Sequence, residues 1–189
     1  MTDVPALFLD RDGVVNTETH FCHRVADFDL RPGVFTLVRH AHRAGYPVVV
    51  VTNQSGLARG IFTDADYATL TDHMRGLFAD AGCPLTDVLH CPFHADAAVA
   101  TYRVANHPWR KPNPGMLLEA QARHGVDLSR SVLVGDRTSD MGAAAAAGLA
   151  AACFVGRDMP GDIAAPRVLA QVADTQAAAA WYGAWLADP

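Results

Sequence analysis

Short runs of hydrophobic residues recur along the chain, and three of them lead to a residue with a side-chain oxygen. These runs are 4–9, followed by Asp10; 47–51, followed by Thr52; and 131–136, which ends in Asp136. Apolar runs of this length without polar alternation are typical of parallel strands that are covered on both faces. We therefore predict strands over these three segments, and two more at 87–90 and 151–155.

Segments with apolar residues at helical spacing separate the predicted strands. The segment 33–44 has this spacing, starts after a proline and stops at a glycine, so we predict a helix there. Thr63 and Asp66 resemble a capping arrangement that opens another helix, which ends near Ala81. Further helices are predicted at 114–124, at 139–147 and, in the tail, around Trp181 and Trp185.

The alternation of strands and helices predicts an α/β fold, a doubly wound parallel sheet with helices on both faces. Such sheets bind ligands beyond the carboxyl ends of their strands, so we expect Asp10, Thr52 and Asp136 to converge. Residues 91–113 lack periodicity and are predicted to form a long loop, which in a compact protein is usually functional. We expect a single domain over residues 1–189.

Composition narrows the choice of partners. A net charge of -5 and a pI near 5.9 provide no basic face for nucleic acid or for an anionic membrane. The most apolar stretch, 141–156, is too short to span a bilayer, and the N-terminus lacks the positive charge of a signal peptide. The four cysteines are widely spaced, which favours reduced thiols. We expect a cytoplasmic monomer that acts on a small molecule.

Two carboxylates stand two residues apart in the sequence DRDGVVN at 10–16. In such a pair Asp10 can attack phosphorus while Asp12 donates and accepts protons. Transfer of a phosphoryl group to a carboxylate splits hydrolysis into formation and breakdown of an acyl phosphate, and a cation neutralises the phosphoryl oxygens. Asp10 and Asp136 offer the hard oxygen ligands that suit Mg²⁺. An ordinary turn would also use acids and glycine in this pattern.

Thr52 and Lys111 complete the candidate set. A threonine hydroxyl and a lysine ammonium are groups that hold a transferring phosphoryl group. Asp140, four residues beyond Asp136, would orient Lys111 or the waters of the metal. Taken singly, the threonine could cap a strand, the lysine could be solvated and Asp136 could cap a helix. Together, each beside a predicted strand or helix, they favour a phosphoryl-transfer site.

Four motifs carry a resemblance to a known family: FLDRDGVVN (8–16), VTN (51–53), RKPNPGM (110–116) and VGDRTSDM (134–141). They resemble the four signatures of the haloacid dehalogenase (HAD) phosphatases. This resemblance implies a HAD-like, Rossmannoid fold and an aspartyl-phosphate intermediate on Asp10. It also implies the other roles: Asp12 as general acid and base, Thr52 and Lys111 as phosphoryl ligands, and Mg²⁺ bound by Asp10, Asp136 and the backbone carbonyl of Asp12.

A narrower resemblance rests on VTNQSGLARGIFT (51–63), CPFH (91–94) and RKPNPGM. These segments resemble the subfamily of D-glycero-D-manno-heptose 1,7-bisphosphate 7-phosphatases and histidinol phosphatases, in its capless form. The resemblance implies a set of substrate-binding residues: Thr17, Glu18, Thr19, His20, Phe21, Asn53, Gln54, Ser55, Arg110 and Arg137. Because guanidinium grips phosphate with two bonds, the two arginines favour a sugar with a second phosphate.

The substrate expected from this resemblance is a phosphorylated sugar, the heptose 1,7-bisphosphate used in making surface glycans such as lipopolysaccharide. Histidinol phosphate is the alternative substrate. A receiver-like regulatory domain, which stores a phosphoryl group on an aspartate, is an alternative of another class. A general acid two residues after the nucleophile favours turnover over storage, and the acidic balance disfavours a module that binds nucleic acid.

One departure from the subfamily concerns a structural zinc loop, patterned C-x-H near position 91 and C-x-C before the RKP motif. Here Cys91 is kept, but Phe93 stands in the place of the histidine. His107 and Trp109 stand in the places of the two later cysteines. Structural zinc needs four ligands, whereas Cys91, His94 and His107 offer at most three. We therefore expect no structural zinc.

Overall fold

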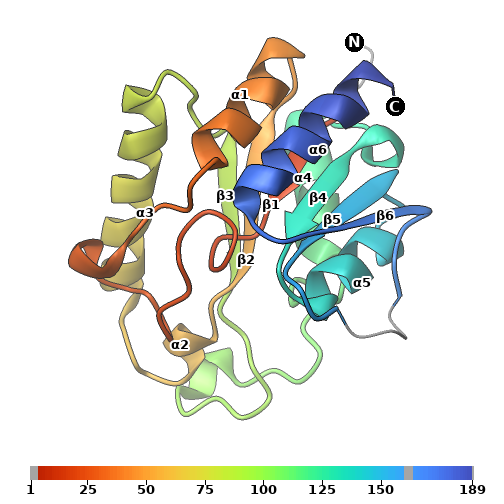
Figure 1. The fold of residues 1–189 in the computed structure, drawn as a ribbon. Helices are drawn as coiled ribbons and strands as arrows, with labels where there is room; N and C mark the ends of the chain where they lie inside the picture. The colour runs from red at the N-terminus through yellow and green to blue at the C-terminus, as the bar shows by residue number, and fades with distance from the viewer. Residues whose placement is uncertain (1–3, 160–163, 189) are drawn as a thin grey trace.

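The computed structural model describes residues 4–159 and 164–188, and its centre is a sheet of six parallel strands (Figure 1). The strands are β1 (Leu7–Leu9), β2 (Val48–Asn53), β3 (Asp87–Cys91), β4 (Val132–Gly135), β5 (Ala151–Val155) and β6 (Val168–Val172). Their order in the sheet is β3-β2-β1-β4-β5-β6. The chain therefore extends the sheet from β1 first in one direction and then in the other, which confirms the doubly wound arrangement.

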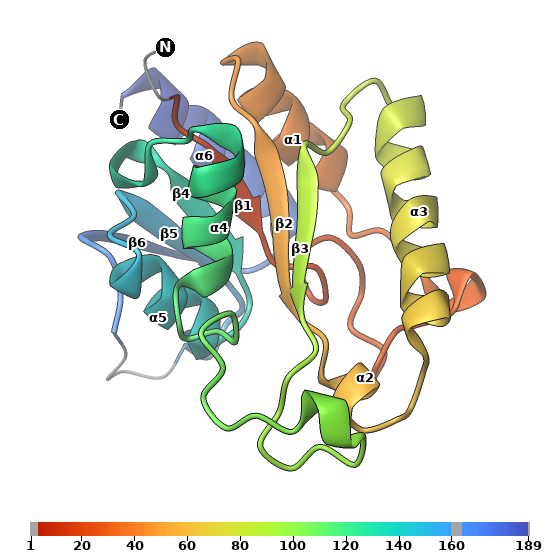
Figure 2. The same ribbon diagram turned by 180° about the vertical axis from the view of Figure 1, so that it is seen from behind.

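Helices cover both faces of the sheet (Figures 1 and 2). On one face lie α1 (Val34–Arg43), α3 (Asp64–Asp80) and α6 (Thr175–Ala187), and on the other lie α4 (Gly115–His124) and α5 (Thr138–Ala146). Because successive strand residues point to opposite faces, each uninterrupted apolar strand supplies both cores. In β2, for example, Val48 and Val50 belong to the first core and Val49 and Val51 to the second.

Most of the predicted helices and strands are confirmed, including the capping arrangement before α3. The Thr63 hydroxyl oxygen accepts a hydrogen bond from the Asp66 N–H, and the Asp66 carboxylate accepts one from the Thr63 N–H. The strand predicted over 4–9 is shorter, because Pro5 has no N–H for the ladder and Val4 forms only an isolated bridge. The residues of β1 are fully buried.

The strand β6 was missed by the sequence prediction, which expected only a tail ending in a helix. This strand lies at the edge of the sheet, and among the described residues it pairs only with β5. Its residues are exposed or half-buried, so the sequence lacks the continuous apolar run of a central strand. The helix expected around Trp181 and Trp185 is confirmed as α6.

The carboxyl edge of the sheet is bordered, within the described residues, by loops and short helices rather than by a separate domain (Figure 2). One border is the loop between β1 and α1, and another is the four-residue helix α2 (Ser55–Ala58). The third is the long loop predicted over 91–113, which contains only a short 3-10 turn at Ala100–Tyr102.

No helix in residues 4–159 or 164–188 is both long and apolar enough to cross a membrane. The four cysteines are buried, and none forms a disulfide within the described chain.

Candidate active site

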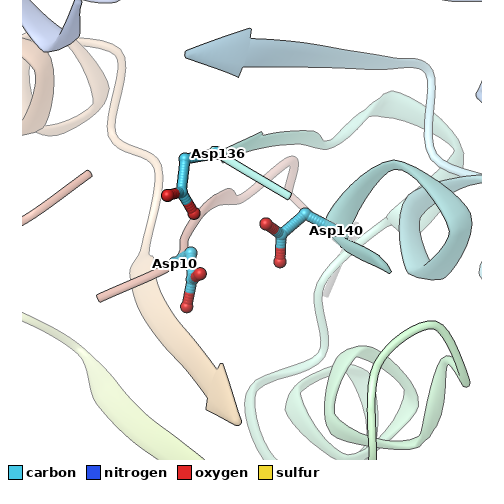
Figure 3. A group of neighbouring side chains, drawn as sticks. All are labelled: Asp10, Asp136 and Asp140. Atoms are coloured by element: carbon cyan, nitrogen blue, oxygen red, sulfur yellow. The ribbon is translucent and has the colours of Figure 1, made fainter. Parts of the chain in front are cut away.

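The site lies where the order of the strands reverses, between β1 and β4. Leu9 of β1 pairs with Val134 of β4, and the N–H of Asp10 donates to the carbonyl of Val134 at 2.9 Å. Asp136 follows the last residue of β4, so the two carboxylates leave neighbouring strands at the same edge. Figure 3 shows them with Asp140, and each of the three offers an oxygen atom within 4.8 Å of the others.

A tight turn after Asp10 brings the loop against Asp136. The carbonyl of Arg11 accepts hydrogen bonds from the N–H groups of Val15 (2.8 Å) and Asn16 (3.1 Å). Gly13 in this turn has φ +89°, and a Cβ there would lie 2.2 Å from Asp136 Oδ2. Both the left-handed backbone and the close approach therefore require glycine.

Lys111 lies buried at the centre of the acidic cluster. Its Nζ lies 2.9 Å from Asp10 Oδ1, 2.5 Å from Asp140 Oδ1 and 2.7 Å from the carbonyl of Val51. The contact with the Val51 carbonyl is a hydrogen bond, and the two contacts with carboxylates are ion pairs. Asn53 holds the lysine backbone at both ends, because its Oδ1 accepts from the Lys111 N–H and its Nδ2 donates to the Lys111 carbonyl, each at 3.1 Å. The long loop is thereby fixed to the end of β2.

Crowding of buried acids changes the proton affinity of the cluster. Burial raises the pKa of Asp10 to about 8, and although Lys111 opposes this shift, the charges of Asp140 and Asp136 add to it. Burial, followed by the charge of Asp140, raises the pKa of Asp136 to about 6. Burial by itself would lower the pKa of Lys111, but the charges of Asp10 and Asp140 outweigh it and raise that pKa. The cluster therefore has more acid groups than one ammonium neutralises.

The donor atoms of this cluster suit a hard divalent cation. Asp136 Oδ1 is buried and has no hydrogen-bond partner in the described part of the chain, which is costly unless another ligand meets it. The backbone carbonyl of Asp12 likewise accepts no backbone hydrogen bond from the described residues. Carboxylate and carbonyl oxygens are the ligands that Mg²⁺ uses. The ligand set expected from the sequence, Asp10, Asp12 and Asp136, is thus compatible with a metal.

Asp12 has very different surroundings. Its carboxylate accepts hydrogen bonds from both the Nε and the Nη2 of Arg11, at 2.9–3.2 Å. Asn16 Nδ2 donates to Oδ1 at 3.1 Å, and Gln54 Nε2 donates to Oδ2 at 2.9 Å. The Asp12 side chain is 23% exposed, whereas that of Arg11 is 2% exposed. Asp12 is therefore held in one orientation by nitrogen donors at the wall of an open pocket.

The pocket over the cluster has a volume of about 280 Å³. Most residues that the sequence suggested for catalysis or substrate binding line it: Asp10, Asp12, Glu18, Phe21, Thr52, Asn53, Gln54, Ser55, Arg110, Lys111 and Arg137. Ser139 also lines it and was not anticipated, because its only signal was its place in the first turn of α5. At the pocket wall Arg137 forms an ion pair with Glu18 at 2.5 Å.

Three residues expected to bind substrate, Thr17, Thr19 and His20, are absent from the lining of this pocket. The backbone of Thr17 turns toward Asp29, whose carbonyl accepts its N–H at 2.8 Å. His20 is exposed and has a left-handed backbone (φ 45°), as does Phe21 (φ 63°). Glu18 and Phe21 line the pocket, whereas Thr17, Thr19 and His20 do not.

The three candidate zinc ligands do not form a cluster within the described residues, where the acidic group is the only set of three potential ligands. His94 Nδ1 accepts from the Asp96 N–H at 3.0 Å, and His107 Nδ1 accepts from the Trp109 N–H at 3.1 Å. The His107 ring stacks on Phe93 with 3.8 Å between centroids. Aromatic packing thus occupies this loop, and the absence of zinc stays a prediction.

Comparisons with known sequences cover most of the chain. The family model described as HAD-hydrolase-like matches residues 108–178. The D-glycero-beta-D-manno-heptose-1,7-bisphosphate 7-phosphatase of Mesorhizobium japonicum is 47% identical over 147 residues, which are 78% of this chain and 67% of that one. The enzyme of the same name from Yersinia pestis is 41% identical over 175 residues, 90% of this chain and 93% of that one.

A solved structure is similar over nearly the whole length. It is D,D-heptose 1,7-bisphosphate phosphatase from B. bronchiseptica, complexed with magnesium and phosphate, with a TM-score of 0.78 and 30% identity. The match covers 95% of this chain and 98% of that chain. Neither a histidinol phosphatase nor a receiver domain is favoured by these relatives. The chain therefore belongs to the HAD-like phosphatase family, in the group that contains the heptose 1,7-bisphosphate 7-phosphatases.

Proposed function

We propose that this phosphatase removes the 7-phosphate of D-glycero-D-manno-heptose 1,7-bisphosphate, with Mg²⁺ as cofactor, during the synthesis of surface glycan precursors such as lipopolysaccharide. The observation that supports it most is the buried Asp10–Lys111 pair, beside two further acids and at the base of a pocket of about 280 Å³. The names of the relatives support the choice of sugar.

In the proposed reaction the carboxylate of Asp10 attacks the phosphorus, and the bond between phosphorus and the sugar oxygen breaks. Asp12 gives its proton to that oxygen, so the sugar leaves as an alcohol. A water molecule then attacks the phosphorus of the acyl phosphate, Asp12 takes a proton from it, and the bond to Asp10 breaks. Lys111 fixes Asp10 Oδ1, and Thr52 donates to a phosphoryl oxygen. Mg²⁺ at Asp10, Asp136 and the Asp12 carbonyl would neutralise charge on the phosphoryl group.

Arg110 and Arg137 support a substrate that carries a second phosphate. Both line the pocket, and Arg110 is oriented by a hydrogen bond from its Nη1 to the carbonyl of Phe93 at 3.2 Å. Arg137 is 61% exposed at its side chain, so a phosphate can reach it. Planar guanidinium groups bind phosphate in a bidentate manner. The substrate phosphate that is not cleaved would therefore lie between these arginines.

The test is phosphate release from both anomers of the heptose bisphosphate and from histidinol phosphate, with Mg²⁺. We expect kcat/KM to be highest for a heptose bisphosphate. Faster turnover of histidinol phosphate would reject the substrate proposed here. A long-lived phosphoaspartate without release of phosphate would instead support the receiver alternative.

We further propose that the enzyme acts as a monomer in the cytoplasm. All side chains assigned to the reaction come from one chain, and its cysteines are buried free thiols, which is typical of reducing compartments. Sedimentation of the purified protein at micromolar concentration tests the first point. A stable dimer would contradict it.

A further inference from the structure

Gln54 lines the pocket, but its side chain is engaged with the protein. It lies between β2 and α2 and is 4% exposed. Its Nε2 donates to Thr52 Oγ1 at 2.9 Å and to Asp12 Oδ2 at 2.9 Å, while its Oε1 accepts from Arg11 Nη2 at 3.3 Å. Its backbone is fixed as well, because its N–H donates to the carbonyl of Cys91 at 2.8 Å.

The orientation of this amide is determined by its partners. An ionised carboxylate only accepts hydrogen bonds, so the group that faces Asp12 Oδ2 in this form must be the NH₂. A guanidinium only donates, so the group facing Arg11 must be the oxygen. The reversed amide would place an oxygen against a carboxylate and an NH₂ against a cation. The two requirements agree, and they assign both hydrogens of Nε2 to Asp12 and Thr52.

This assignment leaves the Gln54 amide without a donor for a substrate phosphate. It also orients the Thr52 hydroxyl, because an oxygen that accepts from Gln54 must turn its own hydrogen elsewhere. Thr52 is itself 1% exposed and lines the pocket, so its hydrogen is available to a phosphoryl oxygen there. Of the described side chains that donate to Asp12, Gln54 alone also donates to Thr52.

We propose that Gln54 is a positioning residue that aligns the general acid Asp12 with the phosphoryl ligand Thr52. The proposal rests on the phosphatase chemistry of the proposed function and not on the identity of the sugar. Arg11 and Asn16 still hold Asp12 when Gln54 is replaced, so the loss concerns alignment rather than charge compensation. Misalignment of a proton donor slows the steps in which the proton moves.

The test uses Gln54→Met, which keeps the length of the side chain and removes the amide. The substrates are a sugar phosphate that the wild type hydrolyses and p-nitrophenyl phosphate, whose leaving group needs little protonation. We expect the first-turnover rate on the sugar phosphate to fall about 10- to 100-fold, a share of the 10²- to 10⁴-fold that general acids contribute. First-turnover release of p-nitrophenol should fall only a few-fold, and KM should change little.

Gln54→Glu is the second variant, because it keeps the shape, loses both donors and adds charge beside Asp12. Its first-turnover rate should again fall much more on the sugar phosphate than on p-nitrophenyl phosphate. The fall on the sugar phosphate should be larger than in Gln54→Met. Gln121→Met, at an exposed position of α4, is the control and should behave as the wild type.

Three results would overturn the proposal. Equal losses on both substrates in the first turnover would show a general structural role. A raised KM with kcat retained would make Gln54 a substrate ligand, and wild-type rates on both substrates would show that the amide is dispensable. A wild type that hydrolyses other sugar phosphates but not the heptose bisphosphate would reject the proposed substrate alone, and the test of Gln54 would proceed on the accepted sugar phosphate.

Discussion

Asp10 and Asp12 are two residues apart, yet their surroundings differ in almost every respect. Asp10 is buried, touches one ammonium and shares a small volume with Asp136 and Asp140. Asp12 lies at the wall of the pocket and receives nitrogen donors from three side chains. The first environment fixes a carboxylate within a candidate cation site, and the second orients a carboxylate at the wall of the pocket. These different surroundings support the proposal that Asp10 attacks and Asp12 transfers protons.

The largest effect should come from Asp10→Asn, which removes the attacking carboxylate and keeps its shape. We expect kcat to fall by at least about 10⁴-fold, as loss of a nucleophile does in other enzymes. Phosphate release under saturating substrate and Mg²⁺ measures it. Asp96→Asn is the matched control, since Asp96 is 86% exposed at its side chain and outside the pocket. Activity in Asp10→Asn close to the control would break the distinction between the two acids.

The next effect concerns Lys111, the cation on the Asp10 side. Lys111→Met leaves Asp10 and Asp140 buried without their counterion, so we expect the free energy of unfolding to fall by about 3 kcal/mol. Arg123→Met is the comparison, because Arg123 is 45% exposed and its ion pairs should contribute less than about 1 kcal/mol. Urea unfolding measures both variants. Equal losses would mean that burial does not distinguish these ion pairs.

A pH dependence follows from the raised pKa values of Asp10 and Asp136, about 8 and about 6. An unfolded aspartate loses its proton near pH 4, whereas these folded ones keep theirs to higher pH. The stability that these two groups contribute to the metal-free protein is therefore lost as pH rises from about 4 to 8. Mg²⁺ binds the ionised carboxylates and should therefore raise the melting temperature more at pH 8 than at pH 5. Thermal unfolding with and without Mg²⁺ tests this expectation.

Asp136→Asn sharpens that measurement. It removes one proposed ligand, so most of the Mg²⁺-dependent shift in melting temperature should disappear. An Mg²⁺ effect that is the same at pH 5 and pH 8, or that persists in this variant, would contradict a cation in the Asp10 cluster.

The smallest effect concerns a contact that supports the loop containing Asp10 and Asp12. Thr175 at the start of α6 is buried, and its hydroxyl donates to the carbonyl of Val14, in the turn after Asp10, at 3.0 Å. Thr175→Val should lower the free energy of unfolding by about 1 kcal/mol. Thr69→Val removes a similar hydrogen bond at an exposed site of α3 and should cost less. Urea unfolding measures both variants. A larger loss of unfolding free energy in Thr69→Val than in Thr175→Val would show that the Thr175 hydrogen bond does not support the loop.

The sequence allowed the carboxyl edge to be predicted because the relevant residues follow, or end, continuous apolar strands. Parallel pairing brings such ends together whatever their separation in the chain, which is why Asp10 and Asp136 could be placed side by side. The chemistry of their side chains suggested the roles of Asp12, Thr52 and Lys111, and the resemblance of the motifs to a family made these roles specific. No pattern of hydrophobicity distinguishes a general acid from an ordinary turn residue.

Other features depend on packing that the sequence does not display. None of the residues of the edge strand β6 is buried, so its sequence lacks the apolar pattern by which a strand is identified. The side-chain contacts of Gln54 require two loops to meet, and neither loop shows this in its own sequence. Thr17, Thr19 and His20 belong to the expected motif, but they do not line the pocket, and the loop that contains them has a left-handed backbone at His20 and Phe21.

The central claim, that Asp10 is the residue that receives the phosphoryl group, is tested most directly by trapping the intermediate. The Asp12→Asn variant retains the nucleophile but lacks the base that activates water. A phosphoryl group should therefore accumulate during incubation with Mg²⁺ and p-nitrophenyl phosphate, whose leaving group needs little protonation. Acid quenching, peptide digestion and mass spectrometry locate it. We predict phosphate on Asp10 in this variant and none on any residue of Asp10→Asn. Phosphate on another side chain would contradict the account.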